Sequence, residues 1–147
     1  MDYKETLLLP TTDYPMRANL PQNEPKKYES WLQNNVYASY ARGRAADFNL
    51  HDGPPYANGH LHIGHALNKT LKDIIVKNAF FSGQSVRYVP GWDCHGLPIE
   101  QEIEKAITKA KKDSLKKEEV RALCREHAKK FVGIQMDEFK KMGVIAD

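Results

Sequence analysis

Four of the six histidines lie in one stretch, HDGPPYANGHLHIGHALNK (residues 51–69), together with three glycines and two prolines. His62 and His65 are three residues apart, so on a helix their side chains would share one face of the same turn. A helix amino terminus offers unpaired N–H groups and a partial positive charge, which suit it to phosphate. Two imidazoles there predict chemistry on a phosphoryl group, with the rings stabilising the charge that develops.

Two other interpretations of these histidines stay open. His60, His62 and His65, together with Cys94 and His95, supply the imidazole and thiolate ligands that zinc uses, but their spacing matches no familiar template and we predict no metal. Alternatively, the rings only cap a helix and form local hydrogen bonds. We interpret Gly64 as a position where a flat base lies close to the backbone.

A second motif, PGWDCHGLPIE (residues 90–100), places an acid between two glycines. Asp93 stands between Gly91 and Gly96, so its carboxylate could face a crevice and pair with a substrate ammonium group. The alternative is that Asp93 caps the next helix.

The elements around both motifs form a predicted βαβ unit. FNLHDG (residues 48–53) is typical of a strand that ends in a turn. Apolar residues from Ile63 onward follow a helical period that closes at FFSG, where Gly83 can end the helix, and SVRYVPGWD predicts a second strand. Such units build parallel sheets, whose ligands bind beyond the carboxyl ends of the strands, where both motifs fall.

The rest of the chain predicts an arm and three helices. Four prolines in residues 1–25 indicate an extended arm. Apolar spacing predicts helices over residues 26–40, 99–109 and 115–142, with a loop at 41–47. We therefore expect an amino-terminal arm and helix in residues 1–46, and the α/β unit in residues 47–147.

Composition limits the class of protein. The chain has 147 residues, 41% of them hydrophobic and 28% charged, which is typical of a globular domain. No apolar run approaches the ~20 residues of a membrane span, and no secretory signal is visible, so we expect no membrane and a cytoplasmic location. Cys94 and Cys124 are then expected to be free thiols.

Positive charge gathers in one segment. Lys105 to Lys130 contains ten Lys or Arg against four Asp or Glu. Such a segment could contact RNA phosphates, but a solvated helix face is the more common explanation of a charge run.

The motifs resemble those of a known family. HIGH (residues 62–65) is similar to the signature of class I aminoacyl-tRNA synthetases, although other nucleotidylyltransferases carry it too. HDGPPYANG, PGWDCHGLPIE and the amino-terminal DYKETLLLPTTDYPMRANLP are more specific and resemble the isoleucyl members of that class. The similarity extends through EFKKMGVIAD, essentially the whole chain. The fold it implies is the first half of a Rossmann-like nucleotide-binding domain.

The resemblance implies an ATP-dependent ligase that activates L-isoleucine to its adenylate and transfers it to tRNA(Ile). Carried over by motif, His62 and His65 would stabilise the transition state at the ATP phosphates. The ATP-binding residues, with Mg²⁺ as the counter-ion of ATP, would be Gly59, His62, Gly64, His65 and Asn68. Pro55 and Tyr56 would border the aliphatic side chain, and Asp93 would hold the α-ammonium group.

The departures from the family matter as well. Its members are several times longer, and this chain lacks the KMSKS loop, the editing domain, the anticodon-binding domain and any cysteine-rich zinc segment. We expect an amino-terminal part of a longer enzyme, weakly active or inactive alone, with an uncovered apolar helix face. Its partners would include the remaining part of the enzyme. The alternatives are a non-catalytic nucleotide- or RNA-binding fragment and a valine- or leucine-specific synthetase.

Overall fold

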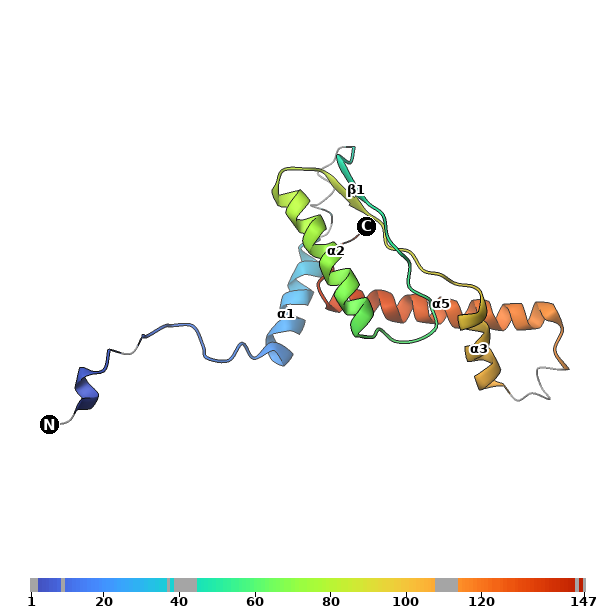
Figure 1. Ribbon diagram of the computed structural model, residues 1–147, viewed down its shortest axis with the longest axis horizontal. Helices are drawn as coiled ribbons and strands as arrows, with labels where there is room; N and C mark the ends of the chain where they lie inside the picture. The colour runs from blue at the N-terminus through green and yellow to red at the C-terminus, as the bar shows by residue number, and fades with distance from the viewer. Residues whose placement is uncertain are drawn as a thin grey trace.

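The computed structural model describes residues 3–8, 10–36, 38, 45–107, 114–144 and 146. Its elements, in chain order, are a 3-10 helix (Tyr3–Thr6), α1 (Leu20–Gln33), β1 (Phe48–Leu50), α2 (Ile63–Phe81), β2 (Val86–Tyr88), α3 (Leu97–Ala106) and α5 (Lys117–Lys141). Residues 3–8 and 10–18 extend away from the other elements (Figure 1).

The centre of the fold is a βαβ unit. β1 and β2 pair in parallel, with Phe48 opposite Val86 and Leu50 opposite Tyr88, and α2 connects them. The predicted strand, helix and parallel strand are confirmed, although both strands are only three residues long. Because parallel strands end on the same side, the two motif-bearing loops leave this sheet at one edge.

The carboxyl end of α2 follows its glycine signal. The helix ends at Phe81, and Gly83 adopts a φ of 89°, a left-handed conformation that glycine takes without steric cost. The N–H of Gly83 donates to the carbonyl of Phe80. This turn returns the chain to β2 within four residues.

The first helix differs from its prediction. α1 spans Leu20–Gln33 rather than residues 26–40, so it begins inside the region predicted to be an extended arm. Pro21 stands in the first turn, where its missing N–H would have had no helical partner, and the helix also tolerates Pro25. The prediction that four prolines make residues 1–25 an extended arm therefore placed the start of this helix too late. Residues 37, 39 and 40 lie outside the described residues.

The two carboxyl-terminal helices match their predictions approximately. α3 begins two residues earlier than predicted and α5 spans Lys117–Lys141. Residues 108–113 of the basic segment, and 41–44 of the predicted loop, are not among the described residues. α5 passes beside α3 in its first half and reaches the foot of α2 with its carboxyl end (Figure 1).

Two apolar clusters hold these elements together. The first joins α2, β2 and α5 through Val76, Val86, Tyr88 and Phe139. The second is formed by Ala57, Ile99 and Ala128, which come from the first loop, α3 and α5. Because α5 contributes to both clusters, this helix fixes the βαβ unit against the two loops.

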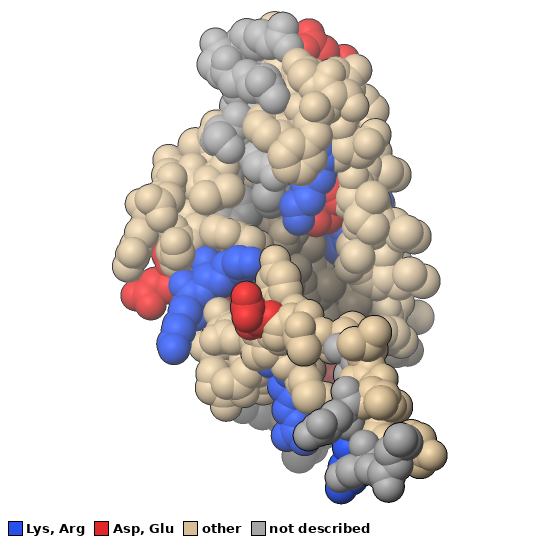
Figure 2. Space-filling view, turned by 90° about the vertical axis from the view of Figure 1, so that its left-hand side faces the viewer, with Lys and Arg blue, Asp and Glu red and all other residues tan. Residues whose placement is uncertain are grey.

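The outward face of α2 is apolar and uncovered. Five side chains on this face are between 46% and 85% exposed: Ile63, Leu67, Leu71, Ile74 and Ile75. The predicted uncovered apolar helix face is thus confirmed. On the side of the molecule shown in Figure 2, charged atoms gather in small groups and most of the surface belongs to other residues.

Two further observations concern membrane-spanning helices and the cysteines. In the described ranges no helix has the length and apolar content to span a bilayer. Cys94 and Cys124 are both free thiols, as predicted.

Candidate functional site

The amino end of α2 is built by His62 and His65. His62 is the N-cap, and its Nδ1 accepts a hydrogen bond from the N–H of Gly64 at 3.1 Å. His65 reaches back, and its Nδ1 accepts from the N–H of His62 at 3.3 Å. The two rings stack, with centroids 3.8 Å apart. The predicted shared face is confirmed, and the capping that stood as the alternative interpretation is present as well.

Capping uses only one nitrogen of each ring. Because each Nδ1 accepts a hydrogen bond, a neutral imidazole must carry its proton on Nε2. Within the described residues, neither Nε2 has a hydrogen-bond partner. Both rings therefore present an Nε2–H donor beside the positive end of the helix dipole, which is an arrangement suited to an anion.

The surroundings keep the His65 ring neutral. Burial, the neighbouring His62 and the ammonium of Lys69 lower the pKa of His65 below its ordinary value. A neutral ring preserves the acceptor at Nδ1 on which the cap depends.

The His62 ring, in its capping position, lies directly over Gly64. A Cβ at Gly64 would lie 2.9 Å from Cε1 of His62, a contact that real structures essentially never show. The structure thus supplies a local reason for glycine at this position, independent of the adenine that the sequence suggested. Asn68, exposed one turn further along α2, lies on the same face as Gly64.

The two motif loops pair with each other beyond the strands. The N–H of Asp93 donates to the carbonyl of Pro55 at 2.8 Å, and the N–H of Ala57 donates to the carbonyl of Asp93 at 3.0 Å. This parallel bridge places Tyr56 opposite Asp93. Three residues predicted to border one substrate are thus side by side.

The Asp93 carboxylate remains partly accessible. Its side chain is 27% exposed, and Oδ1 accepts from the N–H of His95 at 3.3 Å. The alternative in which Asp93 caps the next helix is wrong, because the N-cap of α3 is Gly96 and no side chain caps it. Asp93 instead closes a short turn and keeps its second oxygen for another partner.

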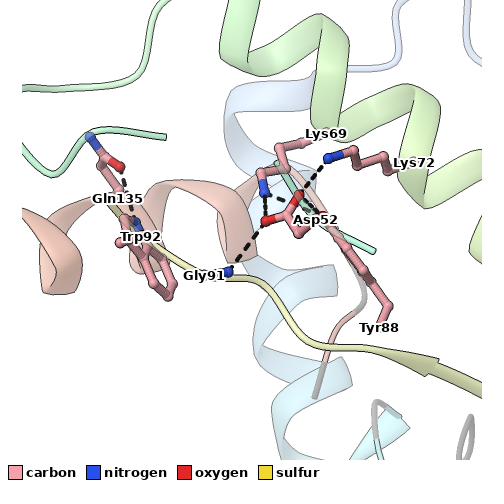
Figure 3. A network of polar contacts seen from close by, with 7 residues as sticks. All are labelled: Asp52, Lys69, Lys72, Tyr88, Gly91, Trp92 and Gln135. Carbon is pink, nitrogen blue, oxygen red and sulfur yellow. Dashed lines mark hydrogen bonds and ion pairs between the residues drawn. The ribbon is translucent and has the colours of Figure 1, made fainter. Parts of the chain in front are cut away.

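A buried ion cluster lies between α2 and the segment that carries Gly91 (Figure 3). Asp52, two residues after the end of β1, accepts from Lys69 and, at 2.5 Å, from Lys72, both on α2. It also accepts from the Tyr88 hydroxyl at 3.1 Å and from the N–H of Gly91 at 3.3 Å. One carboxylate therefore connects α2 to the ends of both strands.

The cluster combines one carboxylate with two ammonium groups. Burial raises the pKa of the Asp52 carboxyl, but hydrogen bonds from Lys69 and Lys72 outweigh burial and hold it below its ordinary value. Burial and the charge of Asp52 raise the pKa of Tyr88, which stays a neutral donor. Asp52 and Lys69 thus form a buried ion pair with additional donors, the arrangement in which such pairs are tolerated.

α5 contacts the loop before α2 at two points. Gln135 donates from Nε2 to the carbonyls of Tyr56 at 3.0 Å and Gly59 at 2.7 Å, and it accepts from Nε1 of Trp92 at 3.0 Å. Figure 3 shows the pairing of Gln135 with Trp92. One turn later, Glu138 accepts from the N–H of Leu61 at 3.0 Å and pairs with Nδ1 of His60 at 2.5 Å.

The candidate metal ligands of the sequence are separated. His60 pairs with Glu138, while His62 and His65 stack on each other. No group of three or more potential ligands occurs in the described part of the chain.

An apolar cavity of about 380 Å³ lies beside the ion cluster. Lys69, Pro90, Trp92 and Phe139 are among its lining residues. Pro55, Tyr56 and Asp93, the residues predicted to hold the amino acid, do not line it.

Sequence reasoning missed the buried cluster and the two α5 contacts. A signal for the cluster was present, since His65, Lys69, Asp73 and Val76 recur at steps of three and four and therefore share a helix face. For Gln135 and Glu138 the sequence held no signal, because their partners lie 43 to 79 residues away along the chain.

Comparison with known proteins gives consistent results. A family model for class I tRNA synthetases (I, L, M and V) matches residues 26–147. The chain is 65% identical over 149 aligned residues to an isoleucine–tRNA ligase of Nitratiruptor sp., and 64% identical to one of Nautilia profundicola. All of this chain is covered, but it spans only 16% of the length of either relative.

Among solved structures, a similar fold occurs in the ternary LeuRS–tRNA–LeuAMS complex of Agrobacterium radiobacter K84. The TM-score is 0.65 at 20% identity, over 88% of this chain and 15% of that one. At this identity the match concerns the fold alone. It agrees with the prediction of half a Rossmann-like domain.

Proposed function

Because this chain belongs to the class I tRNA synthetases of the isoleucine, leucine, methionine and valine group, we propose that it carries the ATP-phosphate half of an isoleucine-activating site. The complete enzyme would act in the cytoplasm on L-isoleucine, ATP with Mg²⁺, and tRNA(Ile). Residues 1–46 would form an arm and helix outside the nucleotide-binding unit. The high identity to isoleucine–tRNA ligases favours isoleucine over valine or leucine.

One observation carries the proposal, namely the donor set at the start of α2. In the proposed reaction a carboxylate oxygen of isoleucine attacks the α-phosphorus of ATP, and pyrophosphate leaves. Negative charge grows on the phosphate oxygens, and preorganised donors stabilise it. The Nε2–H groups of His62 and His65 are oriented by their own caps, so they would need no rearrangement to donate.

The paired loops would hold the amino acid. The Asp93 carboxylate would accept the α-ammonium group, and Tyr56, which lies opposite it, would border the side chain with Pro55. Gly59, Gly64 and Asn68 would line the nucleotide side. Asp93 and its loop would form one wall of the amino-acid site, here called the Asp93 wall. The backbone bridge between the loops keeps this wall in a fixed place, which fixes where the attacking carboxylate of isoleucine stands.

The test is isoleucine-dependent exchange of pyrophosphate into ATP, measured on the full-length polypeptide that carries this segment. Isoleucine should stimulate exchange more than valine or leucine at equal concentration. Exchange stimulated far better by valine or leucine would refute the specificity. The isolated 147 residues should show weak or no exchange, and near-normal turnover by them would contradict a half-site.

A second candidate function is RNA binding along α5. Lys117, Arg121, Arg125 and Lys129 recur at four-residue steps on one face, and none pairs with a carboxylate among the described residues. Three of them line a groove of about 590 Å³ that also contains His95. Unpaired like charges in one row disfavour an isolated helix and suit a phosphate backbone.

Titration of labelled tRNA at several salt concentrations tests this second function. The double variant Arg121→Glu with Arg125→Glu should weaken binding and lower the salt slope by roughly 0.7 to 0.9 per lost phosphate contact. Lys26→Glu, on exposed α1, is the matched control. Unchanged binding and slope in the double variant would remove RNA binding by this row.

A further inference from the structure

Gln135 is a fully buried amide whose hydrogen-bonding groups are all used by the two motif loops. It is 0% exposed. Both of its N–H bonds go to carbonyls of the loop before α2, at Tyr56 and Gly59, and its oxygen takes the indole N–H of Trp92 in the other loop. A buried amide with every partner in place is costly to leave half satisfied, so it constrains its partners strongly.

In the loop before α2, the contacts of Gln135 are to backbone atoms. Because Gln135 bonds to carbonyls rather than to side chains in the first loop, it sets the path of the main chain there. The second carbonyl belongs to Gly59, three residues before the N-cap His62. Its position therefore bears directly on where α2 begins.

Glu138 reinforces the same segment from the next turn of α5. Its carboxylate accepts from the N–H of Leu61, directly before His62, and pairs with His60. The hydrogen bond from His60 lowers the pKa of Glu138; burial opposes this shift, and the hydrogen bond from the N–H of Leu61 adds to it. Gln135 and Glu138 thus hold the entry to α2 at two successive points.

The Asp93 wall has a separate support. Pro55 and Ala57 are bonded to the backbone of Asp93 directly. Loss of the Gln135 amide would leave this bridge intact. The distance between this bridge and the two histidines at the start of α2 would no longer be fixed.

We infer that Gln135 is a positioning residue for the proposed adenylate-forming reaction, which sets the separation between the Asp93 wall and the His62–His65 donors. The inference rests on the proposed function. The residue touches no substrate, and it acts through the main chain of the loop before α2.

The first variant is Gln135→Met in the full-length polypeptide, which keeps the side-chain length and removes all three hydrogen bonds. We expect kcat of isoleucine-dependent exchange to fall about 10- to 100-fold, because a misplacement of about 1 Å has that effect on reacting groups. The KM for isoleucine should change less than about 3-fold, since the Asp93 wall keeps its own bridge. Gln101→Met, exposed on α3, should leave both constants unchanged.

The second variant, Gln135→Glu, tests the role of the donors. An ionised carboxylate would face two carbonyl oxygens, which burial makes unfavourable. On protonation it regains one O–H donor for Gly59 and keeps an acceptor for Trp92. Its kcat relative to the wild type should therefore rise severalfold as the pH is lowered from 8 to 6.

Other titratable groups cancel in this ratio. His60, Asp93, His95 and Glu138 lie on the segments that Gln135 contacts, and all are present in both proteins. The ratio of the two rates divides out any pH dependence that the two proteins share. A pH-dependent ratio thus reports the new carboxyl at position 135.

The outcomes separate the two proposals. A wild-type polypeptide without isoleucine-dependent exchange overturns the proposed function itself. Normal wild-type exchange with an unchanged kcat in Gln135→Met, or with equal losses in kcat and isoleucine affinity, overturns the positioning role. If Gln135→Met does not fold, a pH-independent ratio for Gln135→Glu overturns the role by itself.

Discussion

The two faces of α2 are the reverse of an ordinary surface helix. The inward face buries two charged side chains, Lys69 and Asp73, beside Val76 and Ala79. The outward face exposes Leu67, Leu71 and Ile74 by more than half. A surface helix normally buries its apolar stripe and leaves its charges in water.

The difference shows that apolar pattern alone does not decide which face a helix buries. The inward face can stay buried although it carries charges, because Asp52 supplies a buried counter-charge to Lys69 at the ends of both strands. The outward face has the composition of a surface to be covered. This chain spans only 16% of the length of the relatives, so the relatives contain further segments that are available to cover such a face.

The largest effect is expected from removing the buried counter-charge. Asp52→Asn keeps the shape of the side chain but leaves the Lys69 ammonium buried without its partner. We expect a loss of about 3–5 kcal/mol in the free energy of unfolding, measured by urea denaturation of the chain. Asp137→Asn, exposed on α5, should change it by less than about 0.5 kcal/mol. Equal stabilities of the two variants would break the contrast between the faces.

A smaller effect concerns the cap at the amino end of α2. The pKa of His65 is lowered from its ordinary value of 6.5, so the unfolded chain binds a proton more readily than the folded one. The stability gained is present above about pH 6.5 and is lost as the pH falls through the lowered folded value. An N-terminal cap is worth about 1 kcal/mol, which limits the loss on protonation.

His65→Gln separates this titration from others. Gln at the third helical position can accept from the N-cap N–H without titrating. Urea denaturation between pH 5 and 8 should show a flatter profile in this variant than in the wild type. Parallel profiles would mean that His65 protonation does not control the cap.

The smallest effect belongs to the outward face. Leu71→Gln and Ile74→Gln replace side chains that are already more than half exposed, so each should change the free energy of unfolding of this chain by less than about 0.5 kcal/mol. Binding of a dye that reports exposed apolar surface should decrease. A loss above 2 kcal/mol would show that this face is packed, and would remove the contrast with Asp52→Asn.

The elements with strong local signals were predictable. Glycine and proline stops, apolar periodicity and β-branched residues sufficed for β1, α2 and β2. The spacing of His62 and His65 correctly predicted their common face. These signals lie within a few residues of what they determine, so a single sequence contains them.

The remaining features depend on long-range contacts. The start of α1 was misplaced because Pro21 and Pro25 are tolerated in its early turns. The Asp52 cluster needed both strand ends and α2 to be assembled, and the contacts of Gln135 join segments more than 40 residues apart. No local preference records such contacts.

The central claim is that the Nε2–H donors at the start of α2 stabilise the ATP phosphates, and His62→Asn tests it most directly. Asn is among the best N-cap residues, so the helix start is kept while the distal donor is lost. Isoleucine-dependent exchange by the full-length polypeptide should fall about 100-fold or more, whereas His51→Asn should keep the wild-type rate. An unchanged rate in His62→Asn would contradict the account.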